Sequence, residues 1–480
     1  MSNYYITTSI AYVNGDPHLG HAMEFVMADV LARRARQVGD TVIFSTGTDE
    51  HGGKIAEKAL ELGITPQALA DKVSAKFSTL ANNLNISNNR FIRTTDKGHE
   101  QRAKLIWKAL EKDIYKGKYI GWYCTGDEEF FNEQYVKENK GVCPDHNRPY
   151  EKIEEDNYFF KLSKYGERIL ELIESGQFKI IPETRLNEIV SVIKSGLEDI
   201  SVSRPKSKID WGIPVPGDAD QVMYVWVEAL MNYITVLGYP DHDDFKNFWP
   251  AKAQVIGKGI LRFHAAIWPA MLLSLDLPLP EILYVHGYVT VDNKKMSKSL
   301  GNSVSPDEVI AKYGADAYRY FFLRHIPSYG DGDFTWETFD AAYNNELANE
   351  LGNAVQRTAA MIEKYQKGII GDIPPAKHDI GQYEEALAAC KFDRALDEVW
   401  EQVRGLNQYI DEAKPWIVAK ENDEEHLREI LAYQASSLLE IATMLEPFLP
   451  ETAIKIKAVF EEGIVRPIDG TLFPKQDSVK

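Results

Sequence analysis

The stretch Tyr4-Tyr5-Ile6-Thr7-Thr8, followed by the turn Asn14-Gly15-Asp16-Pro17 and the segment 20–38, decides the fold. Its first five residues are aromatic or β-branched, which favours a strand, whereas asparagine, glycine and proline favour a loop. In the segment 20–38, apolar residues such as Phe25 and Val30 recur at helical spacing. These residues predict a strand, a loop and a long helix.

The same alternation continues on both sides of a long interruption. Gly39-Asp40 ends the helix, residues 41–45 predict a second buried strand, and residues 54–62 return to helix. Much later, residues 253–257 predict a strand, 260–273 a helix and 282–287 another strand. Alternating strands and helices are typical of a parallel sheet, so the sequence predicts one sheet split by an insertion.

The rest of the chain differs in character from the sheet. The insertion mixes strand-like and helical segments, and from residue 338 onward strands nearly vanish, with helical stretches over 341–365, 380–409, 424–445 and 451–459. The predicted class is α/β: a doubly wound, Rossmann-like parallel sheet, split by an inserted α+β connective domain and followed by an all-α helical bundle. The predicted domains are the first half of the sheet domain (1–114), the insertion (115–223), the second half (224–288), a linker (289–340) and the bundle (341–480).

Composition excludes several classes of protein. The chain has 480 residues, 44% hydrophobic and 26% charged, which is ordinary globular usage. Its net charge of −18 argues against coating nucleic acid by bulk charge. Three cysteines cannot make a disulfide framework, the N-terminus lacks a signal-peptide pattern, and the longest apolar stretch, 265–275, is too short to span a bilayer. We expect a cytoplasmic protein without a membrane segment.

The first candidate for chemistry is His18-Leu19-Gly20-His21, at the expected start of the first long helix. Unpaired backbone N–H groups and the positive end of the helix dipole attract phosphate there, and Gly20 lets a ligand approach the backbone. The alternative is a capping loop with two solvated histidines.

The second candidate is Lys295-Met296-Ser297-Lys298-Ser299, on a short loop after the second half of the sheet. Two lysines and two hydroxyls on one loop are suited to holding a polyphosphate as charge develops on it. The alternative is a solvated basic turn. The capping loop and the solvated basic turn each explain one motif. They do not explain why both motifs occur in this order on the two halves of one sheet.

Together these motifs resemble the HIGH and KMSKS signatures of class I aminoacyl-tRNA synthetases. The neighbouring sequences are more particular and resemble the methionyl-tRNA synthetases over nearly the whole chain, from Tyr4 to Lys475. The matching stretches are Tyr12-Val13-Asn14-Gly15, Gly47-Thr48-Asp49-Glu50-His51-Gly52, Trp211-Gly212-Ile213-Pro214-Val215-Pro216, and Arg262-Phe263-His264 running into Trp268-Pro269-Ala270-Met271-Leu272.

The resemblance implies a role for each matching residue. His18, Gly20, His21, Gly287, Lys295 and Lys298 would bind ATP, with the two histidines and the two lysines acting in catalysis. Asp49 would anchor the methionine ammonium group. The thioether pocket would be Ile10, Tyr12, Trp226, Ala229, Leu230, Tyr233, Ile260 and His264. An aromatic, polarizable cavity suits sulfur, although by periodicity alone Trp226 and Tyr233 are ordinary core residues.

The implied reaction has two steps. The methionine carboxylate attacks the α-phosphorus of magnesium-bound ATP, giving methionyl-adenylate and pyrophosphate, and methionine then passes to the terminal adenosine of tRNA(Met). No covalent enzyme intermediate is expected, and positioning and charge stabilisation supply the catalysis.

The helical bundle contains the residues that the resemblance assigns to the anticodon. Asn353 and Arg357 lie four apart on one helix face and could read base edges, while Trp416 could stack on a splayed base. Alternatively, Asn353 caps a turn and Trp416 anchors a helix end.

Three features bear on cofactors and assembly. Cys124, Asp127, Cys143 and His146 have the spacing of a zinc knuckle, but Asp127 stands where a thiolate is usual, so we expect no metal and a knuckle packed by aromatics. Ala11 and Gly259 depart from the family's usual proline and aspartate; the first is expected to loosen the strand end and the second removes a carboxylate near the nucleotide. The sequence ends soon after residue 474 without an appended tRNA-binding domain, so we expect a monomer.

Two other functions stay open at this stage. Another class I synthetase would carry a large editing insertion or a zinc in its amino-acid site. A non-catalytic tRNA-binding relative would be expected to lose His18, His21, Asp49, Lys295 and Lys298, which are all present.

Overall fold

The chain folds into two units that alternate along the sequence. A computed structural model describes residues 2–126, 129–131, 133–144, 147–294, 304–370, 379–461, 463–466 and 470–476. The first unit comprises Met1–Pro17, Gly39–Leu80 and Asn88–Val285. The second comprises His18–Val38, Ala81–Ser87 and His286–Lys480.

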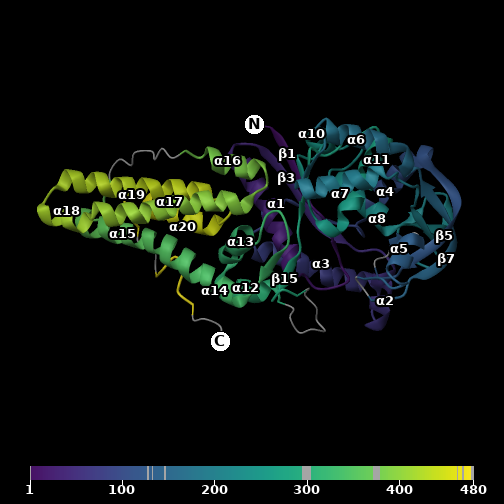
Figure 1. Ribbon diagram of the computed structural model, residues 1–480, viewed down its shortest axis with the longest axis horizontal. Helices are drawn as coiled ribbons and strands as arrows, with labels where there is room; N and C mark the ends of the chain where they lie inside the picture. Colours follow the sequence, from purple (N-terminus) through teal and green to yellow (C-terminus); the bar gives the residue numbers. More distant parts are fainter. Residues whose placement is uncertain are drawn as a thin grey trace. The chain divides into compact units, whose positions relative to one another are not determined.

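A parallel sheet forms the centre of the first unit, as predicted (Figure 1). Its strands, in spatial order, are β2 (Ala11–Tyr12), β3 (Thr41–Asp49), β1 (Asn3–Thr8), β13 (Ala253–Gly257), β14 (Ile282–His286) and β8 (Lys179–Ile181), and β4 (Arg90–Arg93) also pairs with β3. Eight of the nine residues of β3 are buried, as expected for a strand covered on both faces.

Strand β3 is longer than the sequence predicts, because it continues past Ser45 to Asp49. The extra residues pair with β4, which the sequence analysis did not predict. A side chain at Gly47 would meet the carbonyl oxygen of Ile92 at 2.0 Å, so the close approach of β4 requires glycine. Ala11 of β2 pairs with Thr48 of β3, and the expected loosening of this strand end stays a prediction.

The inserted segment has its own antiparallel sheets and also contributes β8 to the parallel sheet. The larger sheet has the order β6 (Glu129–Phe131), β5 (Ile114–Cys124), β7 (Glu151–Phe160), β9 (Ile200–Ser201). The smaller has the order β10 (Ser203–Pro205), β12 (Asp218–Met223), β11 (Pro214–Val215).

The helices of the first unit surround these sheets. They are α2 (Gly53–Glu61), α3 (Pro66–Asn83, which ends in the second unit), α4 (Lys97–Leu110), α5 (Glu133–Glu138), α6 (Gly166–Glu174), α7 (Glu183–Lys194), α8 (Val225–Leu230), α9 (Asn232–Thr235), α10 (Asp243–Phe248) and α11 (Trp268–Ser274). The single helix predicted over 260–273 is wrong in detail, since a 3₁₀ turn (Lys258–Ile260) and a π-helical turn (Phe263–Ile267) precede α11. Pro269 lacks an N–H group and so cannot continue the regular α-helical hydrogen bonds.

The second unit is mostly helical, and α15, α17, α19 and α20 lie side by side in it (Figure 1). Its elements are α1 (Leu19–Gln37), β15 (Val289–Val291), α12 (Pro306–Tyr313), α13 (Ala315–Arg324), β16 (Gly332–Phe334), α14 (Trp336–Ala341), α15 (Asn353–Gln366), α16 (Gly381–Ala388), α17 (Phe392–Ala413), α18 (Pro415–Glu421), α19 (Glu424–Leu445) and α20 (Pro450–Phe460).

Two of the helical stretches predicted here are interrupted. The stretch 380–409 breaks into α16 and α17 because Cys390 takes a left-handed backbone conformation with φ of 53°. The stretch 341–365 begins as a π-helical segment, Ala342–Gly352, before α15. Among the residues that the structure describes, no helix combines the length and apolar character needed to cross a membrane.

A fully buried ion pair joins α1 to α13 within the second unit. Arg319 Nη1 lies 2.7 Å from Asp29 Oδ2, and neither side chain is exposed. Asp29 also accepts hydrogen bonds from Arg33 and Ser87, and Arg319 donates to the carbonyls of Leu84, Pro447 and Phe448. Burial alone would raise the pKa of Asp29, but the two guanidinium groups and Ser87 hold it below its ordinary value.

We predict that Asp29→Ala lowers the free energy of unfolding of the second unit by about 3–5 kcal/mol, because it leaves the Arg319 charge buried without its partner. Urea denaturation of the full chain measures this, with Glu61→Ala, which breaks the exposed Lys58–Glu61 pair, as a control expected to change the free energy of unfolding little. Since the folded-state pKa of Asp29 is lowered, its contribution is present at neutral pH and is lost as the pH falls through that pKa. Equal effects of the two variants would contradict this account.

Candidate active site

The histidine pair caps the first helix of the second unit. His18 is the N-cap of α1, and its Nδ1 accepts hydrogen bonds from the backbone N–H of Gly20 at 3.1 Å and of His21 at 3.3 Å. The Nδ1 of His21 in turn accepts from the backbone N–H of His18 at 3.3 Å, and the two rings stack 3.6 Å apart. His18 therefore caps the helix, as the alternative interpretation of this motif expects, although His21 is only partly exposed.

Both imidazoles are neutral at physiological pH. Although His18 is partly open to solvent, desolvation by the surrounding protein lowers its pKa to about 4. Burial, followed by the neighbouring His18 and His286, lowers the pKa of His21 well below its ordinary value. Because each Nδ1 accepts a backbone hydrogen bond, each ring carries its proton on Nε2. The motif thus offers hydrogen-bond donors without adding full charges.

The next turn of α1 is tied to the end of β14. Glu24 Oε2 lies 2.9 Å from Nε2 of His286, whose Nδ1 lies 2.8 Å from the carbonyl oxygen of Gly287. A side chain at Gly287 would meet the carbonyl oxygen of Gly330 at 1.8 Å, so packing alone requires glycine there. Sequence reasoning did not single out Glu24 and His286, although an acid and a histidine inside apolar segments were a signal.

Lys295 and Lys298 lie outside the described residues. The segment before them is fixed by the backbone N–H of Asn293, which donates to Asp333 Oδ1 at 2.7 Å. After them, Ser305 caps α12.

Three of the predicted thioether residues meet in the first unit. The Tyr233 hydroxyl lies 2.7 Å from Nε2 of His264, and His264 Nδ1 lies 2.9 Å from the carbonyl oxygen of Ile260. Since His264 Nδ1–H donates to that carbonyl, Nε2 is the acceptor and the Tyr233 proton is committed to it. Trp226 stacks on Phe263 with ring centroids 4.1 Å apart. Ala229, Leu230, Tyr233 and His264 are buried, while Ile10, Tyr12, Trp226 and Ile260 are partly exposed.

A cavity of about 610 Å³ lies beside this cluster, between the larger antiparallel sheet of the insertion and the π-helical turn. Phe263, Arg262 and Tyr224 line it, together with Trp122 and Tyr119 of β5. None of the predicted methionine residues lines it.

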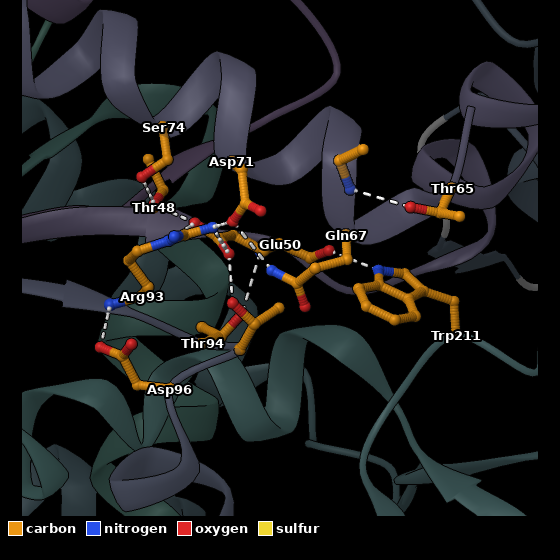
Figure 2. A network of polar contacts seen from close by, with 12 residues as sticks. Thr48, Glu50, Thr65, Gln67, Asp71, Ser74, Arg93, Thr94, Asp96 and Trp211 are labelled. Atoms are coloured by element: carbon orange, nitrogen blue, oxygen red, sulfur yellow. Dashed lines mark hydrogen bonds and ion pairs between the residues drawn. The ribbon is translucent and has the colours of Figure 1, made fainter. Parts of the chain in front are cut away.

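Asp49 ends β3, and the residues after it are fastened by a polar network (Figure 2). The buried Glu50 carboxylate meets Nε and Nη2 of Arg93 at 2.7 and 2.9 Å, and it also accepts from the hydroxyls of Thr48 and Thr95. Figure 2 shows Trp211 reaching the same loop, where its Nε1–H donates to the carbonyl oxygen of Glu50 at 2.6 Å. The two sequence motifs that contain Glu50 and Trp211 are thus in contact.

A second buried acid binds the same loop from the other side. Glu228 of α8 accepts from His51 Nδ1 at 2.8 Å and from His99 Nε2 at 2.9 Å, and its side chain is 0% exposed. Burial alone would raise the pKa of Glu228, but the two imidazoles hold it below its ordinary value. Sequence reasoning missed Glu228, although a lone acid in the apolar helix Val225–Leu230 was a signal.

The anticodon candidates lie in the bundle of the second unit. The Arg357 guanidinium lies 5.9 Å from the centroid of the Trp416 ring and donates to Asp411 at 2.8 Å. Asn353 is exposed at the start of α15, one turn before Arg357. The structure therefore brings Arg357 and Trp416 together, a proximity that spacing could not establish.

The candidate zinc knuckle is described only in part. Cys124 and Cys143 are buried and share a small cluster with Val136 and Tyr150. Asp127 and His146 lie outside the described residues. Within the part of the chain that the structure describes, no group of three or more His, Cys, Asp or Glu side chains has the arrangement of a metal site.

Comparison with known proteins agrees with this fold. A family model described as "tRNA synthetases class I (M)" matches residues 4–152 and 145–359. The methionine–tRNA ligase of Caldanaerobacter subterraneus subsp. tengcongensis is 44% identical over 476 residues, covering 96% of this chain and 73% of that protein. That of Brucella melitensis is 43% identical, covering 94% of this chain and 90% of that protein. The solved structure of Mycobacterium tuberculosis methionyl-tRNA synthetase in complex with methionyl-adenylate matches with a TM-score of 0.91 and 36% identity, over 99% of this chain and 100% of that chain.

The split parallel sheet, the helical bundle and the matching family model define a class I aminoacyl-tRNA synthetase. Within this class the relatives that match nearly the whole chain are methionine–tRNA ligases. The chain belongs to the methionyl-tRNA synthetase family.

We predict that His18 does not change its protonation between pH 5.5 and pH 8, because burial lowers its pKa to about 4, and that His21, whose pKa burial lowers well below its ordinary value, is neutral at physiological pH. Ring ¹³C resonances of histidine-labelled protein measure this, with His18→Asn and His21→Asn variants used for assignment. His51 serves as an internal contrast, since Glu228 raises its pKa despite its burial. A titration midpoint near 6.5 for either capping histidine would contradict the prediction.

Proposed function

We propose that this chain activates methionine with ATP to methionyl-adenylate and pyrophosphate, and then transfers methionine to the 3′ end of tRNA(Met). The observation that carries the proposal is the high identity of nearly the whole chain to methionine–tRNA ligases. The likeness to a synthetase solved with methionyl-adenylate supports ATP as the substrate.

The first step needs no covalent bond to the protein. An oxygen of the methionine carboxylate bonds to the α-phosphorus of ATP while the bond to the bridging oxygen breaks, and pyrophosphate carries away the electron pair. His18 and His21 donate hydrogen bonds to the phosphates, and Gly20 and Gly287 allow the nucleotide to approach the backbone. Because both imidazoles are neutral, Lys295 and Lys298 supply the positive charge that matches charge developing on the leaving group. ATP enters as its magnesium complex.

Asp49 and the thioether cluster select the amino acid. The Asp49 carboxylate binds the substrate ammonium group. The side chains of Ile10, Tyr12, Trp226, Ala229, Leu230, Tyr233, Ile260 and His264 form the cavity for the thioether. Their aromatic and polarizable surface favours sulfur.

In the second step a hydroxyl of the terminal tRNA ribose attacks the methionyl carbonyl carbon, and AMP leaves. Asn353 and Arg357 read anticodon bases and Trp416 stacks on one of them. The contact between Arg357 and Trp416 supports this assignment, since a guanidinium held beside an indole forms a surface for splayed bases.

The remaining assignments belong to the same proposal. The chain works as a monomer in the cytoplasm, with the five domains 1–114, 115–223, 224–288, 289–340 and 341–480.

Its insertion folds without zinc, because Asp127 replaces a thiolate, and Cys124 and Cys143 pack in an apolar cluster. Elemental analysis that found about one zinc per chain would contradict the last point.

The test of activation is methionine-dependent exchange of pyrophosphate into ATP. We predict that Lys298→Ala lowers kcat of this exchange about a hundredfold with little change in the KM for methionine, because the contact forms mainly in the transition state. Lys140→Ala, on a turn of the insertion, is the matched control and should leave both constants unchanged. Exchange that is unaffected by Lys298→Ala would remove this lysine from the proposed catalytic set.

We predict that Trp416→Ala leaves pyrophosphate exchange intact but lowers aminoacylation at limiting tRNA by about ten- to a hundredfold, since stacking is worth roughly 1–3 kcal/mol per base. Arg357→Gln should act in the same direction. If both assays and the melting temperature fell together, Trp416 would be a structural anchor of α18 instead.

A further inference from the structure

The loop that follows Asp49 is bound to the helices that carry the thioether cluster through one buried carboxylate. Glu228 lies on α8 between Trp226 and Ala229, and its Oε1 meets His51, two residues after Asp49. Its Oε2 meets His99 of α4. The ring of His51 also packs against Trp211, with centroids 5.4 Å apart.

The chain of contacts continues to the next pocket helix. His99 Nδ1 lies 2.8 Å from the Thr235 hydroxyl, and that hydroxyl lies 3.3 Å from the carbonyl oxygen of Asn232. Asn232 and Thr235 bound α9, which carries Tyr233. The carboxylate therefore connects the Asp49 loop with both short helices that hold Trp226, Ala229, Leu230 and Tyr233.

We propose that Glu228 is a positioning residue for methionine, because through His51 it fixes Asp49 relative to the thioether cluster. The position of Asp49 then sets the distance between the ammonium group and the sulfur atom of a substrate that the site accepts. This inference rests on the proposed function, because it takes Asp49 as the ammonium anchor. Glu228 touches neither the reacting atoms nor the substrate in this account.

The energetic reason for this role lies in burial. The side chains of Glu228 and His99 are 0% exposed and that of His51 is 4% exposed, so none of the three can exchange its partner for water. Other acids face the same imidazole, with Glu50 and Glu100 adding to the negative field around His51. A buried carboxylate bound to two imidazoles has few alternative arrangements, which holds the loop in one geometry.

Glu228→Gln tests the proposal with almost no change in volume. A carboxylate accepts from both imidazoles, whereas an amide can accept from only one and presents its own N–H groups to the other. One of the two hydrogen bonds is therefore lost, unless an imidazole changes its tautomer. We expect the KM for methionine in pyrophosphate exchange to rise roughly tenfold while kcat changes by less than about twofold.

Two substrate fragments distinguish positioning from general damage. As inhibitors of exchange, 3-(methylsulfanyl)propylamine keeps the ammonium group and 4-(methylsulfanyl)butanoate lacks it, and both keep the thioether. In Glu228→Gln the inhibition constant of the amine should rise about tenfold and that of the butanoate should stay unchanged. An equal rise for both fragments, or no rise for either, would overturn the proposal.

Further variants keep the test decisive if Glu228→Gln folds poorly. His51→Phe keeps a ring against Trp211 but removes the donor to Glu228, so it should reproduce the selective rise in the inhibition constant of the amine. His51→Gln retains a donor to Glu228, so most of this rise should be absent. Asp113→Asn is the matched control. Asp113 is also a buried carboxylate of the first unit, and accepts from Lys164, Tyr165 and Ser274. It should cost stability without changing either inhibition constant.

The outcomes separate this inference from the function on which it rests. Methionine-dependent exchange in the wild type with unchanged constants in Glu228→Gln and His51→Phe would overturn the positioning role alone. Absence of exchange in the wild type would overturn the proposed function and this inference with it.

Discussion

Burial of acids at the carboxyl end of β3 is the constraint on which the first unit depends. Asp49, Glu50 and Glu228 are each no more than 5% exposed, and a buried carboxylate is tolerated only with nearby donors or opposite charge. Donors to Glu50 and Glu228 come from far apart in the sequence: Arg93 ends β4 and His99 lies on α4, while Trp211 of the insertion donates to the backbone carbonyl of Glu50. These donors reach one loop because β4 pairs with the extension of β3 and because the insertion returns to the same loop.

Helix α1 has a comparable place in the second unit. Its N-terminus is capped by the stacked histidines, its second turn meets His286, and its third places Asp29 against Arg319. The cap stabilises the helix and at the same time fixes the tautomers of His18 and His21. One set of hydrogen bonds therefore satisfies the helix end and leaves on Nε2 the donors that the proposed function assigns to phosphate.

The electrostatics of the two units differ in a way that suits their proposed substrates. The proposed ammonium anchor, Asp49, is an acid of the first unit, and the loop after it is bound to the buried Glu228 through His51. In the second unit the capping histidines are uncharged, so the charge of a polyphosphate has to be balanced by lysines on a separate loop.

The sequence by itself determined the class of fold, the family and the motifs, because these depend on local periodicity and on residue types at fixed spacing. The strands β1 and β13 and the helices α1 and α19 lie almost where periodicity places them, since each is long or clearly bounded. Tertiary structure alone decided β4 and β8, the break at Cys390 and the π-helical turns, because these depend on neighbours distant in sequence or on single backbone conformations. It also decided that Trp211 holds Glu50, that Arg357 meets Trp416, and that Glu228 binds His51 and His99. A lone acid in an apolar helix has no visible partner in the sequence, and only the folded chain shows which charges and donors burial has forced together.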